Sequence, residues 1–172
     1  MTWNDVFTEL FDRCVALYQA GNKDFETYYS EADLAFLGSI GHKPREFFDF
    51  VEDFCEEAVP SPATALLVAS VRRDYFIVKQ ERVPSEGPFL TRDDVPTFGD
   101  ELQGIAYLPR ILAKARAKLR GELDPDLMFG CGGDRNFLSK HGDLHPADFL
   151  RRVWAAGEDD EKVAEWVLAG GK

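Results

Sequence analysis

The sequence predicts an all-α protein built from two tandem copies of one small helical module, with about eight helices in total. Three observations predict this class. Apolar residues recur at helical spacing along most of the 172-residue chain. Capping residues and prolines precede these runs, and glycines follow them. No alternating strand pattern extends beyond a few residues. A hydrophobic content of 45% suffices for one core or for two small cores packed together.

The first predicted helix covers residues 3–20, where apolar side chains recur three and four positions apart. Thr2 can cap its start, and Gly21 can end it. The second helix begins at Ser30-x-x-Asp33. In this pattern the serine oxygen and the carboxylate each accept a hydrogen bond from the other residue's backbone N–H.

Glycine and proline mark the next two helices. Gly41 ends the second helix, and Pro44 fits the first turn of the third, where its missing N–H costs nothing. Ser61-Pro62 repeats this start signal and opens a fourth helix, which continues to about Arg82. Residues 1–82 therefore form the predicted N-terminal module.

Residues 83–99 form a predicted connecting segment, because they hold three prolines and show no sustained period. Residues 100–172 form the C-terminal module, whose first helix carries an apolar face from Ile105 to Leu119. We expect the two modules to form one globular unit. The later helices of this module are predicted at 134–140, 146–156 and 160–168.

The two modules resemble each other in sequence. A shift of 101 residues places Asp33 on Asp134, and one inserted residue then places Pro44 on Pro146. Seven identical pairs arise, all at positions with a capping, stopping or core role, which favours an internal repeat over chance. The pairs are Asp33/Asp134, Phe36/Phe137, Leu37/Leu138, Gly41/Gly142, Pro44/Pro146, Phe47/Phe149 and Val51/Val153.

Net charge, the lengths of the apolar runs and the number of cysteines each disfavour a class of protein. A net charge of −11 repels nucleic-acid phosphates, so nucleic acid is a disfavoured partner. No window approaches the roughly 18 apolar residues of a membrane span, and the N-terminus lacks a leader pattern, so we expect a cytoplasmic protein. Cys14, Cys55 and Cys131 are odd in number and widely spaced, which argues against a disulfide framework.

Two residues at the start of the 134–140 helix invite a chemical interpretation. Asp134 recurs as Asp33 in the other module, but both lie three residues after a cap candidate, which favours helix capping over catalysis. Cys131 lies at a helix start, where a thiolate is stabilised. Its counterpart is Ser30, an ordinary cap, so a structural role is favoured here too.

Cys131, His141 and His145 have the order of a metal-binding series. Gly142 should end the helix between the two histidines, and His145 directly precedes Pro146, where it only flanks the next helix start. The sequence therefore predicts no metal site, and it contains no pattern that calls for a cofactor.

Arg110, Lys114 and Lys118 form a predicted basic stripe along one helix, with Arg116 and Arg120 beside it. The stripe could hold an anion. The alternative, which we favour, is charge pairing with the acidic helix at residues 46–57, either between modules or between subunits.

The stretch Leu102–Arg110, followed by Lys114 and Arg116, resembles a bacterial family called domain of unknown function 5069. The likeness covers roughly residues 95–168 and extends through Cys131–Asp134 and Glu165–Val167. This chain departs at Gln103, where the family prefers glycine, and at Gly132-Gly133, where it often has Pro-Leu. The family has no established activity, so the resemblance implies a structural unit without a function.

The leading hypothesis is a non-catalytic helical binding or adaptor protein that uses the groove between the modules or the basic stripe for an unknown protein or a small anionic ligand. The alternative is an enzyme or small-molecule binder with a site at the junction of the two modules. A structural homo-oligomer is a third possibility. The candidate binding residues are Tyr107, Arg110, Lys114, Cys131 and Asp134, and no residue is predicted to be catalytic.

Overall fold

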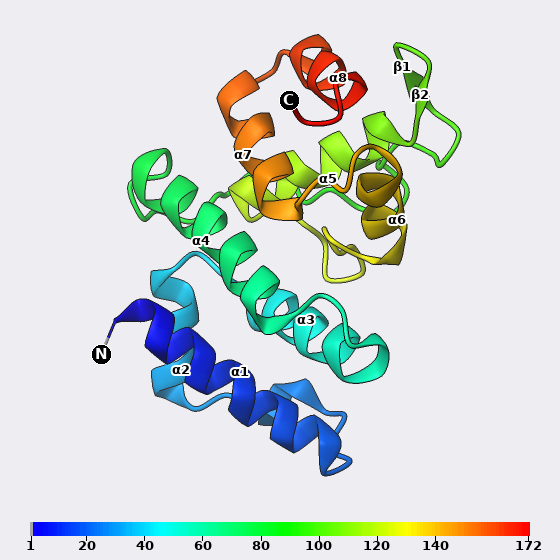
Figure 1. Cartoon of the computed structure of the whole chain (residues 1–172). Helices are drawn as coiled ribbons and strands as arrows, with labels where there is room; N and C mark the ends of the chain where they lie inside the picture. Colours follow the sequence, from blue (N-terminus) through cyan, green and yellow to red (C-terminus); the bar gives the residue numbers. More distant parts are fainter. Residues whose placement is uncertain (1) are drawn as a thin grey trace. The chain divides into compact units, whose positions relative to one another are not determined.

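The computed structural model describes residues 2–172, and within them it has eight α-helices and one hairpin of two short strands (Figure 1). The predicted all-α class is therefore confirmed. The chain divides into two compact units, the first ending at Pro84 and the second spanning Ser85–Lys172. We call them unit 1 and unit 2.

In unit 1 the long first helix packs against the third and fourth helices. Phenylalanine rings make much of this contact, since Phe7 and Phe11 of the first helix both meet Phe47 of the third. The elements are α1 (Trp3–Gln19), the 3-10 turn η1 (Phe25–Thr27), α2 (Glu31–Ser39), α3 (Pro44–Glu57) and α4 (Pro62–Val78).

The predicted start signals of unit 1 are confirmed. Thr2 and Ser30 each form a reciprocal cap with a carboxylate three residues later, and Ser61 caps α4. The fourth helix ends at Val78 rather than near Arg82. The reason is local, because Glu81 and Arg82 adopt left-handed backbone conformations that a helix cannot include.

Unit 2 repeats the arrangement of a long first helix packed on a proline-started helix, here α5 against α7, with α8 packed on α7. Its elements are β1 (Glu101–Leu102), β2 (Ile105–Ala106), α5 (Leu108–Arg120), α6 (Gly132–Lys140), α7 (Pro146–Ala156) and α8 (Asp160–Leu168). The core includes Leu108, Ile111, Leu112, Phe149 and Val153, all of them buried.

The start of α5 corrects the sequence prediction. Ile105 belongs to β2, which pairs antiparallel with β1, and not to the apolar face of the helix. Gln103 and Gly104, with φ of 51° and 75°, make the turn between the strands. Tyr107 also has a left-handed φ of 74°, so helical geometry begins only at Leu108. A left-handed position favours glycine, so Gln103 is an unusual residue for this turn.

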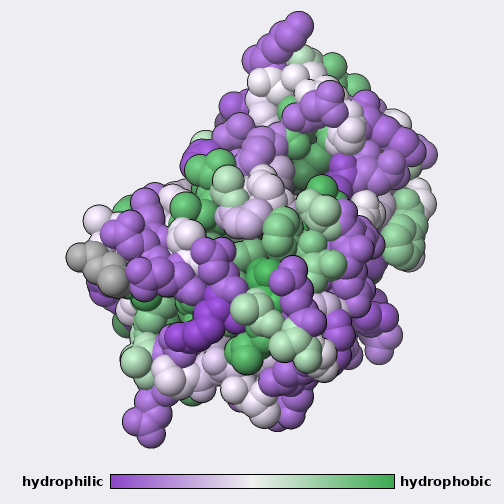
Figure 2. Space-filling view, turned by 60° about the horizontal axis from the view of Figure 1, so that its bottom comes forward, coloured by the Kyte–Doolittle hydropathy of each residue, from purple (hydrophilic) through white to green (hydrophobic). Residues whose placement is uncertain are grey.

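No helix within residues 2–172 has the length and apolar character needed to cross a membrane. The surface view shows hydrophilic side chains over much of one face, interrupted by apolar patches (Figure 2).

Asp33→Asn tests the capped ion pair of unit 1. Burial raises the pKa of Asp33, but hydrogen bonds from Arg13 and Ser30 outweigh it, and the pKa lies below its usual value. A depressed pKa stabilises the fold above the unfolded value and loses that contribution as the pH falls through the folded value. We expect Asp33→Asn to lose about 1 kcal/mol of the free energy of unfolding at neutral pH, and this loss should shrink as the pH falls through the lowered pKa of Asp33, as measured by urea unfolding.

The control is Asp12→Asn, an exposed carboxylate on α1, which should leave the free energy of unfolding nearly unchanged. A loss in Asp33→Asn that stays the same from neutral to acid pH would contradict the assignment.

Candidate functional site

Asp134, at the start of α6, is the centre of a buried polar cluster in unit 2. Its side chain is 0% exposed, and its two oxygens accept three hydrogen bonds. Oδ2 accepts from Lys114 Nζ at 2.7 Å and from the Gly130 backbone N–H at 2.7 Å. Oδ1 accepts from the Tyr107 hydroxyl at 2.9 Å. The carboxylate thus joins α5, the residue before α5, and the loop that leads into α6.

The cap predicted for this helix is wrong in its details. Cys131 is the N-cap residue, but its side chain makes no capping hydrogen bond. Asp134 reaches past it to the N–H of Gly130. The Cys131 sulfur instead lies 3.3 Å from Lys114 Nζ. Because the ammonium can donate to both the sulfur and the carboxylate, it draws Cys131 into the cluster.

Arg110, the fifth candidate, lies beside the cluster rather than in it. Its guanidinium donates to the Pro96 carbonyl at 2.7 Å and lies 4.3 Å from the centre of the Phe98 ring. The Phe98 ring is in turn 5.8 Å from the ring of Tyr107. The structure therefore joins Tyr107, Lys114, Cys131 and Asp134 directly, whereas Arg110 lies beside them, in contact with Phe98 and close enough for its charge to act on Tyr107.

The predicted basic stripe does not exist as a surface feature. Lys114 and Lys118 are each only 2% exposed. Arg116 binds Asp160 and the carbonyl of Gly157, both within unit 2. A run of basic residues on a helix normally indicates a face in contact with water. Here the basic side chains instead interact with other groups of the protein.

Tyr107 is held as a hydrogen-bond donor. Burial raises the pKa of its hydroxyl, and the negative charge of Asp134 and their hydrogen bond raise it further, far above the usual range. A phenol that keeps its proton so firmly is a poor general acid or base at neutral pH. Its ring, in contrast, is available as an apolar surface.

Unit 1 contains a simpler version of the same ion pair. The shift of 101 residues that aligns Asp33 with Asp134 also aligns Arg13 with Lys114. Arg13 binds Asp33 at 2.6 Å, as Lys114 binds Asp134 at 2.7 Å. The side chains are 50% and 13% exposed in unit 1 but 2% and 0% exposed in unit 2.

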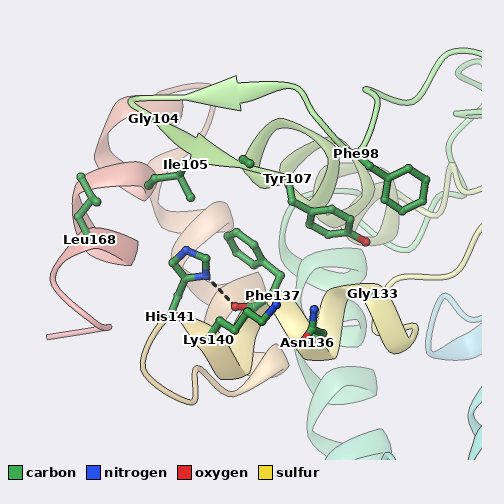
Figure 3. Close-up of a pocket in the computed structure, with 11 residues that line it drawn as sticks. Phe98, Gly104, Ile105, Tyr107, Gly133, Asn136, Phe137, Lys140, His141 and Leu168 are labelled. Carbon is green, nitrogen blue, oxygen red and sulfur yellow. Dashed lines mark hydrogen bonds between the residues drawn. The ribbon is translucent and has the colours of Figure 1, made fainter.

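An open pocket of about 680 Å³ lies between the hairpin, α6 and the end of α8 (Figure 3). Phe137 and Tyr107 stack at 5.7 Å along its wall. Phe98 and Leu168 at its edge are 68% and 63% exposed, which is unusual for large apolar residues. The lining residues are Phe98, Gly104, Ile105, Ala106, Tyr107, Gly133, Asn136, Phe137, Lys140, His141 and Leu168.

Three polar side chains of the pocket lie at the end of α6: Asn136 and Lys140 belong to the helix, and His141 directly follows it. The Nδ1 atom of His141 lies 2.8 Å from the Phe137 carbonyl (Figure 3). A carbonyl can only accept, so Nδ1 carries the hydrogen, and Nε2 has no partner within residues 2–172. Asn136 and Lys140 likewise have no hydrogen bond or ion pair to other described residues.

Sequence reasoning missed this pocket, because it considered His141 only as a metal ligand and did not single out Asn136 or Lys140. A partial signal did exist, since positions 136 and 140 are one turn apart and therefore neighbours on one helix face. His145 has the role predicted for it, accepting at 3.2 Å from the Ala147 N–H at the start of α7. Residues 2–172 contain no group of three His, Cys, Asp or Glu side chains placed to hold a metal.

Comparison with known proteins supports the resemblance seen in the second half. Residues 97–172 match the model of the family described as a domain of unknown function (DUF5069). Neither the curated proteins nor the solved structures contain a match. The matched segment holds the whole cluster and the whole pocket, while the description of the family gives no activity.

Lys114→Met and Arg13→Met form a matched pair of substitutions. Removing Lys114 leaves Asp134 buried without its counter-charge, which should cost about 3–5 kcal/mol of the free energy of unfolding. Removing Arg13 leaves a partly solvated Asp33 and should cost about 0–1 kcal/mol. Urea unfolding of the two variants measures both values. Equal losses would show that the burial of Lys114 has no energetic consequence.

Gly133→Ala and Gly132→Ala test how Tyr107 is seated. A Cβ atom at Gly133 would lie 2.6 Å from the Tyr107 hydroxyl oxygen, whereas at Gly132 it would meet only Arg135, at 3.8 Å. Gly132→Ala should stabilise the chain by about 0.5 kcal/mol. Gly133→Ala should destabilise it and remove the Tyr107–Asp134 hydrogen bond, visible as a changed Tyr107 ring signal by NMR. If both substitutions changed the free energy of unfolding in the same direction, this packing argument would be refuted.

Proposed function

We propose that unit 2 is a small-molecule-binding domain whose pocket takes a compact apolar anion, such as an aromatic or branched aliphatic carboxylate. The observation that carries the proposal is a set of three side chains at the end of α6, Asn136, Lys140 and His141, which line an apolar pocket. Asn136 and Lys140 engage no other described residue, and His141 binds the Phe137 carbonyl through Nδ1 but keeps Nε2 for the pocket. Polar groups converging on an apolar cavity are typical of ligand sites.

The size and apolar lining of the pocket support a small ligand. A volume of about 680 Å³ falls in the range of small-molecule sites. The rings of Tyr107 and Phe137 offer aromatic surface on one wall, and Ile105 and Leu168 lie along the other (Figure 3). Covering the exposed rims of Phe98 and Leu168 would remove apolar area from water, at roughly 25 cal/mol per Å².

Charge supports an anion. The chain carries a net charge of −11, yet the pocket presents the Lys140 ammonium and a histidine and has no acidic lining residue. A carboxylate near Lys140 could also accept from the Asn136 amide, and from His141 when its ring is protonated. Asn136 and Lys140 lie one turn apart on α6, so one anionic group could meet both of them.

Binding is better supported than catalysis. Asp134, Lys114 and the Tyr107 hydroxyl satisfy one another inside the fold. These hydrogen bonds hold the Tyr107 side of the pocket wall in place. They also occupy the groups that are suited to proton transfer, so these groups do not face a ligand. This proposal replaces the basic stripe as the anion site and keeps the non-catalytic binding class.

We extend the proposal in two respects. Cys14, Cys55 and Cys131 are free thiols, which supports the predicted cytoplasmic location. The equivalent Arg13–Asp33 and Lys114–Asp134 pairs support an internal repeat in which both units keep the ion pair and unit 2 buries it.

Phenylacetate, an aromatic carboxylate, is the probe for this site. Titrated into the ¹⁵N-labelled chain, it should give saturable shifts of the backbone amides of Ile105, Phe137 and His141. The uncharged phenylacetamide should bind more weakly. Lys140→Met should weaken phenylacetate about two- to fivefold, as expected for losing one exposed charge interaction.

The control is Lys162→Met, which removes the same charge from an exposed position on α8 outside the pocket lining. It should leave the affinity unchanged. The proposal fails if neither probe gives saturable shifts at the pocket, or if phenylacetamide binds as well as phenylacetate.

A further inference from the structure

The buried cluster holds one feature that ligand binding does not use. Lys114 Nζ lies between two groups, 2.7 Å from Asp134 Oδ2 and 3.3 Å from Cys131 Sγ. Lys114 is almost fully buried, whereas Cys131 is partly exposed at the start of α6. An oxidant can therefore reach the sulfur from solvent while the amine stays in place behind it.

We propose that Cys131 and Lys114 form a covalent modification site, in which oxidation of Cys131 by hydrogen peroxide leads to a sulfenamide bond between Cys131 Sγ and Lys114 Nζ. The geometry supplies the three groups the reaction needs: a reachable sulfur, a nitrogen nucleophile in contact with it, and a carboxylate in contact with the nitrogen.

The first step oxidises the sulfur. Cys131 Sγ attacks one oxygen of hydrogen peroxide, an S–O bond forms, and the O–O bond breaks. The thiol proton leaves with the second oxygen as water. The sulfur is now a sulfenic acid, and the peroxide has been reduced. Sulfenic acids condense with nearby nitrogen or thiol groups.

The second step forms the cross-link. The Lys114 ammonium transfers a proton to Asp134, and the freed lone pair on Nζ attacks the sulfur. The S–O bond breaks, and the departing hydroxide takes a second lysine proton and leaves as water. The products are the S–N bond, water and a neutral Asp134 carboxyl group.

The other two cysteines are less suited to this chemistry. Burial raises the pKa of Cys14 to about 12 and also raises that of Cys55, so both are poor in the reactive thiolate. Neither has a lysine within hydrogen-bond distance in the described structure. Selectivity for Cys131 therefore follows from its surroundings.

The experiment uses the full chain carrying Cys14→Ala and Cys55→Ser, so that Cys131 is the sole thiol. After treatment with hydrogen peroxide, the intact monomer should lose the mass of two hydrogen atoms, which no intramolecular disulfide can explain. Proteolysis should release one peptide pair joined through Lys114 and Cys131, and a thiol reductant should restore the original mass.

The matched variant adds Lys114→Arg to this background, keeping the positive charge but removing the amine. It should gain oxygen at Cys131, trapped by dimedone, instead of losing two hydrogens. Lys140→Arg, in the same background, should still cross-link. The proposal is overturned if the Lys114 chain only gains oxygen, or if Lys114→Arg still loses two hydrogens, which would identify a different nitrogen partner.

Discussion

The ion pair between Lys114 and Asp134 is the interaction on which the arrangement of unit 2 depends. Both side chains are removed from water, and a buried charge without its partner costs several kcal/mol. Each therefore fixes the position of the other, and α5 is tied to the first turn of α6. The second oxygen of Asp134 then fixes the Tyr107 hydroxyl, and with it the point where the hairpin joins α5.

Comparison of the ion pairs of unit 1 and unit 2 shows how burial changes the role of such a pair. Arg13 and Asp33 hold two helices of unit 1 together at a half-solvated position, where water can replace either partner. In unit 2 the pair is sealed, and the space around it is shared with Tyr107 and Cys131. Tyr107 connects the ion pair to the pocket wall, and Cys131 connects it to the solvent-exposed surface. Neither connection exists at Asp33, whose other partner is its own cap, Ser30.

Local signals predicted the helices well and tertiary features poorly. Caps such as Ser30 and first-turn prolines such as Pro146 act through their own backbone neighbours, so sequence alone locates them. The predicted start of α5 is wrong because Ile105 pairs in the hairpin and the backbone of Tyr107 is left-handed, with its N–H donating to the Asp100 carbonyl. The burial of Lys114 escaped prediction for a similar reason. The structure brings four of the five candidate residues into one buried cluster, but the pocket is lined by only one of them, Tyr107, so their role in binding stays a prediction.

The groups suited to proton transfer lie in the buried cluster and not in the open pocket, and this arrangement favours binding over catalysis. A catalytic site exposes its proton-transfer groups to the substrate, whereas here Asp134 is 0% exposed and the Tyr107 hydroxyl donates to it. What reaches the cavity is the tyrosine ring, together with Asn136 and Lys140 of α6, which no other described residue engages. A wall with fixed aromatic surface and uncommitted donors loses little freedom when a ligand enters, which favours affinity. Tyr107 and Cys131 are the half-buried members of the cluster, and of these two only Cys131 offers a reactive sulfur, so chemistry at this centre should begin there rather than in the pocket.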